Sequence, residues 1–135
     1  MLNQKAAIFE ERSEVIDQIE YDSDQFIITL KAPKAAKAAK PGEFAFVDCG
    51  ENTLLRRPLS YLRTNPEKET VEFMYKIIGP GLEALSKMST GDYVQMMGPI
   101  GNGFNHDPLK EIPVFIGGGV GIPPVLFLAE YLKKS

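Results

Sequence analysis

Apolar and polar residues alternate along most of the first hundred positions, with the two-residue period of half-buried strands. Turn residues such as Asp22-Ser23-Asp24 and Asn65-Pro66 separate these runs. Six or more short strands with no long connection favour a small closed antiparallel barrel, because closure leaves no exposed sheet edge. The predicted strands are Lys5–Glu11, Glu14–Glu20, Gln25–Lys31, Glu43–Cys49, Arg56–Arg63, Thr70–Ile78 and Tyr93–Met97.

Three segments between the strands break the alternation. The Ala/Lys run Lys34–Lys40 is bracketed by prolines, which predicts a loop with one helical turn. We interpret it as a solvated linker rather than a functional basic patch. Leu82–Met88 has the apolar spacing of a short helix, and "GPIGNGF" (Gly98–Phe104) predicts an irregular loop whose backbone approaches another group closely.

The C-terminal pattern differs from that of the first hundred residues. Ile112–Ile116 is β-branched and apolar like a buried parallel strand, a glycine run follows, and Pro123-Pro124 precedes a predicted helix Val125–Lys134. Strand, glycine turn and helix start form the opening of a nucleotide-binding unit, whose amides could hold a pyrophosphate. A tight packing turn is the alternative, since Ile122 stands where the G-x-G-x-x-G pattern has its third glycine.

Composition limits the class of protein. A chain of 135 residues with 44% apolar content suits one domain with a small appendage. The formal charge of −3 argues against a nucleic-acid partner. A single cysteine (Cys49) and a single histidine (His106) argue against a disulfide, a zinc site or an iron–sulfur site. We read both as structural or solvated residues and predict no catalytic side chain and no metal site.

Membrane insertion is not expected from the sequence. Ile112–Ala129 carries no charge, but glycines and prolines interrupt it, and lipid could not satisfy the backbone groups that they free. The first ten residues mix polar and apolar types without the apolar core of a signal peptide. A cytoplasmic location is therefore expected.

Two interior stretches could bind an anion. Arg57 offers a planar, permanently charged fork in "RPLS", where strand alternation places Leu59 on the face of Arg57, and Pro58 and Ser60 on the opposite face. The proline indicates a strand that faces a ligand or an edge. Gly79-Pro80-Gly81 ends another strand at a helix start, where free amides favour negative charge. Taken singly, an exposed surface strand and an ordinary turn explain the two stretches as well.

The order of the motifs carries more information than each motif does. The chain contains, in sequence, Pro41-Gly42-Glu43-Phe44, then Arg57–Ser60, then Tyr75-Lys76 with Gly79–Leu82, then "GPIGNGF", then "GGGVGIPP". This series resembles the ferredoxin-reductase superfamily over nearly the whole chain. It looks most like the electron-transfer subunits of dihydroorotate dehydrogenases that use NAD, with glutamate where the family usually has Pro-Gly-Gln-Phe.

The resemblance implies a mainly β fold: a six-stranded antiparallel Greek-key barrel that binds FAD, with one short helix, followed by a strand–helix remnant of an NAD(P)-binding domain. The expected domains are 1–104 and 105–135. By position, Arg57 would meet the flavin diphosphate or ribityl group, and Ser60 would lie near flavin N5. The further FAD candidates are Pro58, Leu59, main-chain groups of Tyr75, Lys76 and Ile77, and Gly81 with Leu82, which replaces the family's threonine. The NAD(P) candidates are Gly117, Gly118, Gly119, Gly121 and Pro123.

The family also implies partners and cofactors. Electrons would pass between NAD(H) and a catalytic dehydrogenase subunit in a hetero-oligomer of pyrimidine biosynthesis. Fuller members carry the rest of the NAD domain and a [2Fe–2S] cluster, whose cysteines are absent from these 135 residues. We expect the chain to retain FAD without oxidising NADH efficiently by itself, and its last strand to pack on the barrel, self-associate, pair with another polypeptide or stay poorly ordered.

Three alternatives remain open at this point. A related sulfide dehydrogenase subunit or another ferredoxin–NADP reductase would share the same motifs. A non-catalytic barrel that has lost its redox domain would explain both the leucine at position 82 and the short C-terminal part. Flavin absorbance of the purified chain separates the reductases from the non-catalytic barrel.

Overall fold

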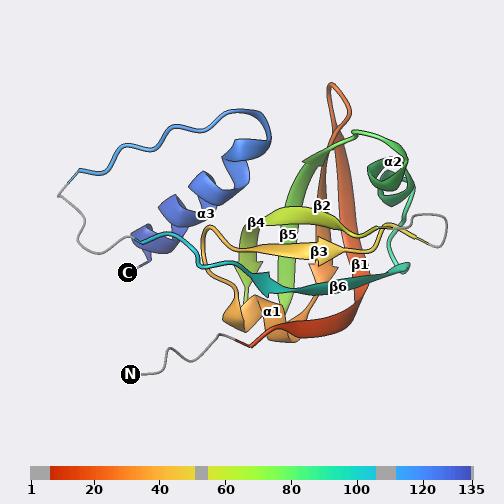
Figure 1. The fold of residues 1–135 in the computed structure, drawn as a ribbon, viewed down its shortest axis with the longest axis horizontal. Helices are drawn as coiled ribbons and strands as arrows, with labels where there is room; N and C mark the ends of the chain where they lie inside the picture. The colour runs from red at the N-terminus through yellow and green to blue at the C-terminus, as the bar shows by residue number, and fades with distance from the viewer. Residues whose placement is uncertain (1–6, 51–54, 106–111, 135) are drawn as a thin grey trace.

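The barrel expected from the alternation is present in the structure, a computed structural model that describes residues 7–50, 55–105 and 112–134. Its six strands close in the order β1-β2-β5-β4-β3-β6, and all the pairs are antiparallel (Figure 1). The Greek-key prediction is thus confirmed. The elements are β1 (Phe9–Tyr21), β2 (Gln25–Lys31), α1 (Pro33–Ala38), β3 (Phe44–Val47), β4 (Arg57–Asn65), β5 (Thr70–Lys76), α2 (Pro80–Ser86), β6 (Tyr93–Ile100), a 3₁₀ turn η1 (Gly119–Gly121) and α3 (Ile122–Lys133).

The first strand corrects the prediction of two strands at the N-terminus. A single strand, β1, runs through the expected break, and positions 5 and 6 lie outside the described residues. Its first half pairs with β6 and its second half with β2, with an irregularity of register between Val15 and Asp17. One long strand can therefore join both sides of the barrel and close it, which local alternation does not reveal.

The barrel is filled by side chains from alternate positions of every strand. Val71, Phe73 and Tyr75 of β5 are buried on one face, as the alternation predicted. Tyr61 packs against Phe73 with ring centroids 4.9 Å apart. The interior is therefore a packed core rather than a cavity, and ligands must bind on the outside or at an end.

The Ala/Lys segment is not the solvated linker that we expected. Pro33–Ala38 forms α1, and Ala32, Ala35, Ala36 and Ala39 are buried in the core cluster. The Glu11 carboxylate accepts hydrogen bonds from the backbone amides of Lys34 and Ala35, at 2.9 and 3.2 Å. The barrel thus has two short helices, α1 and α2, where one was predicted. The alanines provide small side chains that let the helix lie close to the strands.

The "GPIGNGF" segment is partly regular. Strand β6 extends to Ile100, so only the later residues of the motif form the predicted loop. This loop folds back on the Pro41-Gly42 turn, where the Phe104 amide donates to the Pro41 carbonyl at 3.0 Å. The close approach that the glycines predicted is therefore to the chain itself, and the two motifs stabilise one another.

Gly98 is required by the packing of the core. A Cβ atom at this position would lie 2.6 Å from Oη of Tyr61 and 3.0 Å from Cβ of Ala45, and both of these residues are fully buried. We expect Gly98→Ala to lower the free energy of unfolding by about 1–3 kcal/mol through overpacking. Urea titration measures this. Gly118→Ala is the control, since φ of Gly118 is −148° and its Cβ would meet no atom within 4 Å; equal losses in the two variants would contradict the packing argument.

Glu43 is a buried carboxyl beside α1. Its Oε1 atom accepts a hydrogen bond from the Lys40 amide at 2.6 Å, and burial raises the pKa of Glu43 against the opposing effects of Lys40. The native chain therefore binds this proton more tightly than the unfolded chain. The resulting contribution to stability is present below the ordinary pKa of 4.5 and is lost as pH rises through the raised pKa.

Glu43→Gln should remove this pH dependence. The amide oxygen of glutamine can keep the Lys40 hydrogen bond but carries no charge to be desolvated. We expect the variant to be more stable than the wild type at neutral pH and to converge with it below pH 4.5. Urea titrations across this range measure the difference, with Glu67→Gln in the exposed β4–β5 turn as the control. A gap between variant and wild type that stays constant with pH would count against this account.

The C-terminal segment differs most from expectation. Ile112–Ile116 forms no strand, and Ile112, Val114 and Ile116 are 84%, 80% and 87% exposed. The predicted helix does form, and it begins at Ile122 with prolines in its first turn. Figure 1 shows α3 lying beside β4, with the extended segment passing over its outer side. Among the described residues, no helix is both long and apolar enough to cross a bilayer.

Candidate functional site

Strands β4 and β5 separate at one end of the barrel. Their ladder starts at the pair Tyr61–Phe73, so Arg57–Ser60 is paired only with β3. On the other side of the gap, Met74–Lys76 is paired only with β2. Each strand therefore turns a backbone edge toward the opening, which fits the prediction that the strand with Pro58 faces a ligand or an edge. The sequence-predicted FAD residues of both strands lie along this gap.

The gap leads to the N-terminus of α2, where Arg57 meets Gly81. A Cβ atom on Gly81 would lie 2.9 Å from Nε and 3.1 Å from Nη2 of Arg57, so a residue with a side chain would displace the guanidinium. Arg57 also donates from Nη1 to the Leu55 carbonyl at 3.2 Å. A permanent positive charge thus stands over the first turn of a helix, where the backbone amides and the helix dipole also favour an anion.

Successive side chains of β4 beside this site alternate between the core and the outside of the barrel. Leu59 is 7% exposed and belongs to the core, whereas Pro58 is exposed and Ser60 half-buried. Leu59 can therefore contribute only backbone to an external ligand. The hydroxyl of Ser60 lies on the outward face of the strand, opposite to Leu59.

Tyr75 and Leu82 also direct their side chains inward. Tyr75 is 2% exposed, stacks on Phe26 with ring centroids 5.5 Å apart, and donates its hydroxyl proton to Gln18, and burial raises its pKa. Leu82 is 9% exposed and packs in the core cluster with Leu85. Both residues can offer the site only main-chain groups. For Leu82 this means that the lost threonine hydroxyl is exchanged for core packing, while the amide stays in place.

The glycine stretch forms a separate, exposed feature. Gly119–Gly121 makes the single turn η1, which leads directly into α3. A Cβ on Gly118, Gly119 or Gly121 would meet no atom within 4 Å, so these glycines make no tight packing contact. Pro123, by contrast, is fully buried. The predicted nucleotide residues therefore divide into an open glycine turn and a proline that anchors it.

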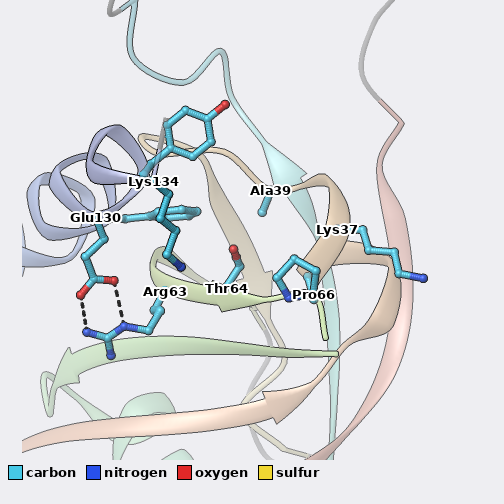
Figure 2. A pocket seen from close by; sticks show the side chains of 10 residues that line it. Lys37, Ala39, Arg63, Thr64, Pro66, Glu130 and Lys134 are labelled. Atoms are coloured by element: carbon cyan, nitrogen blue, oxygen red, sulfur yellow. Dashed lines mark hydrogen bonds and ion pairs between the residues drawn. The ribbon is translucent and has the colours of Figure 1, made fainter. Parts of the chain in front are cut away.

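Helix α3 is fastened to the barrel by an ion-pair cluster that the sequence did not reveal. Arg63 donates from Nε and Nη2 to both carboxylate oxygens of Glu130, at 2.9 and 2.6 Å (Figure 2). It also donates from Nη1 to Glu72 at 3.1 Å. The hydrogen bonds from Arg63 to Glu130 lower the pKa of Glu130. Phe127, one turn earlier, is 5% exposed and packs in the barrel core cluster. A cavity of about 200 Å³ remains between α1, β4 and α3, and none of the predicted site residues lines it.

Comparison with proteins of known sequence finds relatives that are similar over most of this chain. No protein-family model matches the chain. Curated relatives do: the electron transfer subunit of dihydroorotate dehydrogenase B (NAD(+)) from Shouchella clausii is 34% identical over 128 residues, covering 92% of this chain and 49% of the relative. The subunit of the same name from Caldanaerobacter subterraneus is 41% identical over 99 residues, covering 73% and 39%. The chain thus spans about half the length of the curated relatives it matches.

Solved structures agree in fold. An NADH-dependent reduced ferredoxin–NADP oxidoreductase superposes with a TM-score of 0.76 and 29% identity over 90% of this chain and 44% of that one. The ferredoxin reductase of carbazole 1,9a-dioxygenase gives a TM-score of 0.77 at 22% identity, covering 92% and 39%. The chain has the fold of these ferredoxin reductases and is similar to the electron transfer subunits over most of its own length. The resemblance drawn from the order of the motifs is confirmed.

Within the ferredoxin-reductase fold, the motifs of this chain have unequal roles. Pro41-Gly42 and "GPIGNGF" hold one end of the barrel together, whereas Arg57 and Gly81 form a charged opening beside the gap. Cys49 is fully buried, burial raises the pKa of its thiol, and we read it as a core residue, while His106 lies outside the described residues. No signal in the sequence pointed to the pairing of Arg63 with Glu130, which are 67 positions apart.

Proposed function

We propose that the gap between β4 and β5 binds FAD and that the chain is the flavin-binding portion of an electron-transfer subunit. The observation that carries the proposal is the contact of Arg57 with Gly81 at the mouth of the gap. It places a phosphate-binding cation directly over helix amides, beside two strand edges whose backbone groups face outward. The NADH-dependent reduced ferredoxin–NADP oxidoreductase that shares this fold is described in terms of flavin-based electron bifurcation, which supports the same cofactor class.

The residues present fit a dinucleotide of this kind. The Arg57 guanidinium and the amides of Gly81 and Leu82 would hold the diphosphate. They place positive charge and N–H donors close together, and Gly81 has no side chain between its backbone and the guanidinium. Main-chain groups of Tyr75, Lys76 and Ile77 would hydrogen-bond the ring edge, and Ser60 would donate near its reactive nitrogen. Bound flavin supplies the exchange between two-electron and one-electron transfer. The protein binds and orients it, and the packed barrel keeps water from one face.

The electron donor and acceptor follow from the relatives' names. We propose that the complete protein passes electrons between NAD(H) and a catalytic dihydroorotate dehydrogenase subunit, with residues 1–104 as the flavin domain and 105–135 as the start of the NAD(P) domain. The exposed glycine turn of Gly117, Gly118, Gly119 and Gly121 supports nucleotide binding there, because the open space around Gly118, Gly119 and Gly121 lets a ligand approach the backbone closely. Pro123 would hold this turn against the barrel.

A second candidate has an observation of its own. The NADH-dependent reduced ferredoxin–NADP oxidoreductase is 29% identical to this chain and shares its fold. A subunit of such an oxidoreductase would use the same flavin site but a different electron acceptor. Reconstitution with the catalytic dehydrogenase subunit of the same organism distinguishes the two, since only the first candidate predicts reduction by dihydroorotate.

Flavin binding by the 135-residue chain tests the proposal directly. The purified chain, incubated with FAD and desalted, is expected to show absorbance near about 450 nm at roughly one equivalent. FMN, which lacks the second phosphate and the adenosine, is expected to bind more weakly, because it cannot span from the gap to α2. A colourless chain after reconstitution would favour the non-catalytic barrel instead.

A further inference from the structure

The outer face of the sheet β1-β2-β5 carries an apolar row beside the proposed flavin gap. Ile19, Ile27 and Met74 are directly opposite one another on the three strands, as the register pairs Ile19–Ile27 and Ile27–Met74 show. Their side chains leave the core, and Ile19 is 44% exposed. Outward positions of a solvated antiparallel sheet are normally polar. Three apolar residues in one cross-strand row are therefore unexpected on a free surface.

The row borders a shallow depression at the end of the β1–β2 hairpin. The depression has a volume of about 380 Å³ and is lined by Tyr21, Asp22, Gln25, Ile27 and Met74. Tyr21, half exposed, stands next to Ile19 on the same face of β1. Figure 1 shows the tip of this hairpin reaching beyond the rest of the barrel, where a partner can approach it. The shape suits one inserted apolar or aromatic side chain, the usual centre of a protein interface.

The charged residues around the row indicate which charges a partner must carry at the edge of its contact surface. Asp17, Asp22 and Asp24 are exposed, and none takes part in an ion pair among the described residues. Among the described β5 residues that lie in register with the hairpin of β1 and β2, Lys76, opposite Gln25, is the one cation. A partner that covers the row must therefore present mainly lysine or arginine to these carboxylates.

We propose that this surface, the Ile19–Ile27–Met74 row with its acidic rim, docks the catalytic dehydrogenase subunit through an apolar side chain surrounded by basic residues. The inference rests on the proposed function. Met74 lies on the edge of the β4–β5 gap, so a partner seated on the row would lie beside bound flavin. Such proximity is what transfer of electrons between two subunits requires.

The test is binding of the purified 135-residue chain, loaded with FAD, to the purified catalytic subunit of the same organism by biolayer interferometry. Ile19→Lys is expected to weaken the complex by about tenfold or more, since it places a cation at the centre of the row. Asp17→Lys with Asp22→Lys should slow association at low salt, with the difference shrinking as salt rises. Glu67→Lys, in the exposed turn at the opposite end of the barrel, is the control and should bind like the wild type.

Each other outcome overturns the inference in a recognisable way. Equal binding by wild type and Ile19→Lys, or no complex with a flavin-loaded chain, overturns the docking surface and leaves flavin binding intact. Loss of flavin from Ile19→Lys would assign the row to the cofactor. A dimer of the wild type that Ile19→Lys separates, measured by light scattering, would assign it to a second copy. Absence of flavin from the wild type itself contradicts the proposed function instead.

Discussion

Arg57→Ala is expected to weaken FAD binding by about 10- to 100-fold. Hydrogen bonds to charged groups contribute about 1.5–3 kcal/mol each, and Arg57 supplies the permanent charge at the mouth of the gap. The fold should survive, because the Arg57 side chain lies outside the core cluster. Titration of the apo chain with FAD, followed by flavin fluorescence, measures the dissociation constant.

The neighbouring arginine provides a matched control for this experiment. Arg56 carries the same charge but pairs with Glu10 at 2.6 Å. We expect Arg56→Ala to bind FAD as the wild type does. Similar losses in the two variants would show that net positive charge, rather than the placement of Arg57 over Gly81, determines affinity. Gly81→Ala should then discriminate further, since its Cβ displaces the Arg57 guanidinium without removing charge.

Phe127→Ala is expected to release α3 from the barrel. Truncating a buried phenylalanine costs about 3–5 kcal/mol, and Phe127 is 5% exposed in the contact between helix and core. Amide hydrogen exchange in α3 should accelerate by about a hundredfold to a few thousandfold, while exchange in the barrel strands stays slow. Mass spectrometry of peptides from both regions measures the two rates.

Leu126→Ala is the control, because Leu126 faces the extended segment with Phe115 rather than the barrel. It should leave protection of α3 from exchange nearly unchanged.

Acid should loosen α3 in the same direction as Phe127→Ala. The Arg63 hydrogen bonds lower the pKa of Glu130, so the ion pair contributes at neutral pH and its contribution is lost as pH falls through that lowered pKa. Uniform acceleration across strands and helix would mean that α3 and the barrel unfold as one unit.

The barrel was predictable because strand alternation is local. The buried face of β5 and the turn between β1 and β2 both follow from neighbouring residues alone. The same local view divided β1 in two. It could not show that this strand pairs with β6 in its first half and with β2 in its second.

The candidate site was predictable in part. The order of the motifs indicated which segments meet a flavin, and the structure brings Arg57 to Gly81 as that order implies. The alternation anticipated that Tyr75 is buried, but the inward side chains of Leu59 and Leu82 were not foreseen as limits on their contacts. Burial depends on which face of each element the fold turns toward the core. From the sequence alone, Leu82 is equally consistent with a site residue and with a core residue.

By itself, the sequence determined the resemblance to ferredoxin reductases, the barrel and the segments that border the site, because alternation, turn residues and motif order are properties of short stretches. Only the tertiary structure decided that β4 and β5 separate beside Arg57, that Glu130 pairs with Arg63, and that Ile112–Ile116 forms no strand. The physical reason is the same in each case. A strand needs a hydrogen-bonding neighbour, and an ion pair needs a partner, that lies far away in the sequence and is supplied only when the chain has folded.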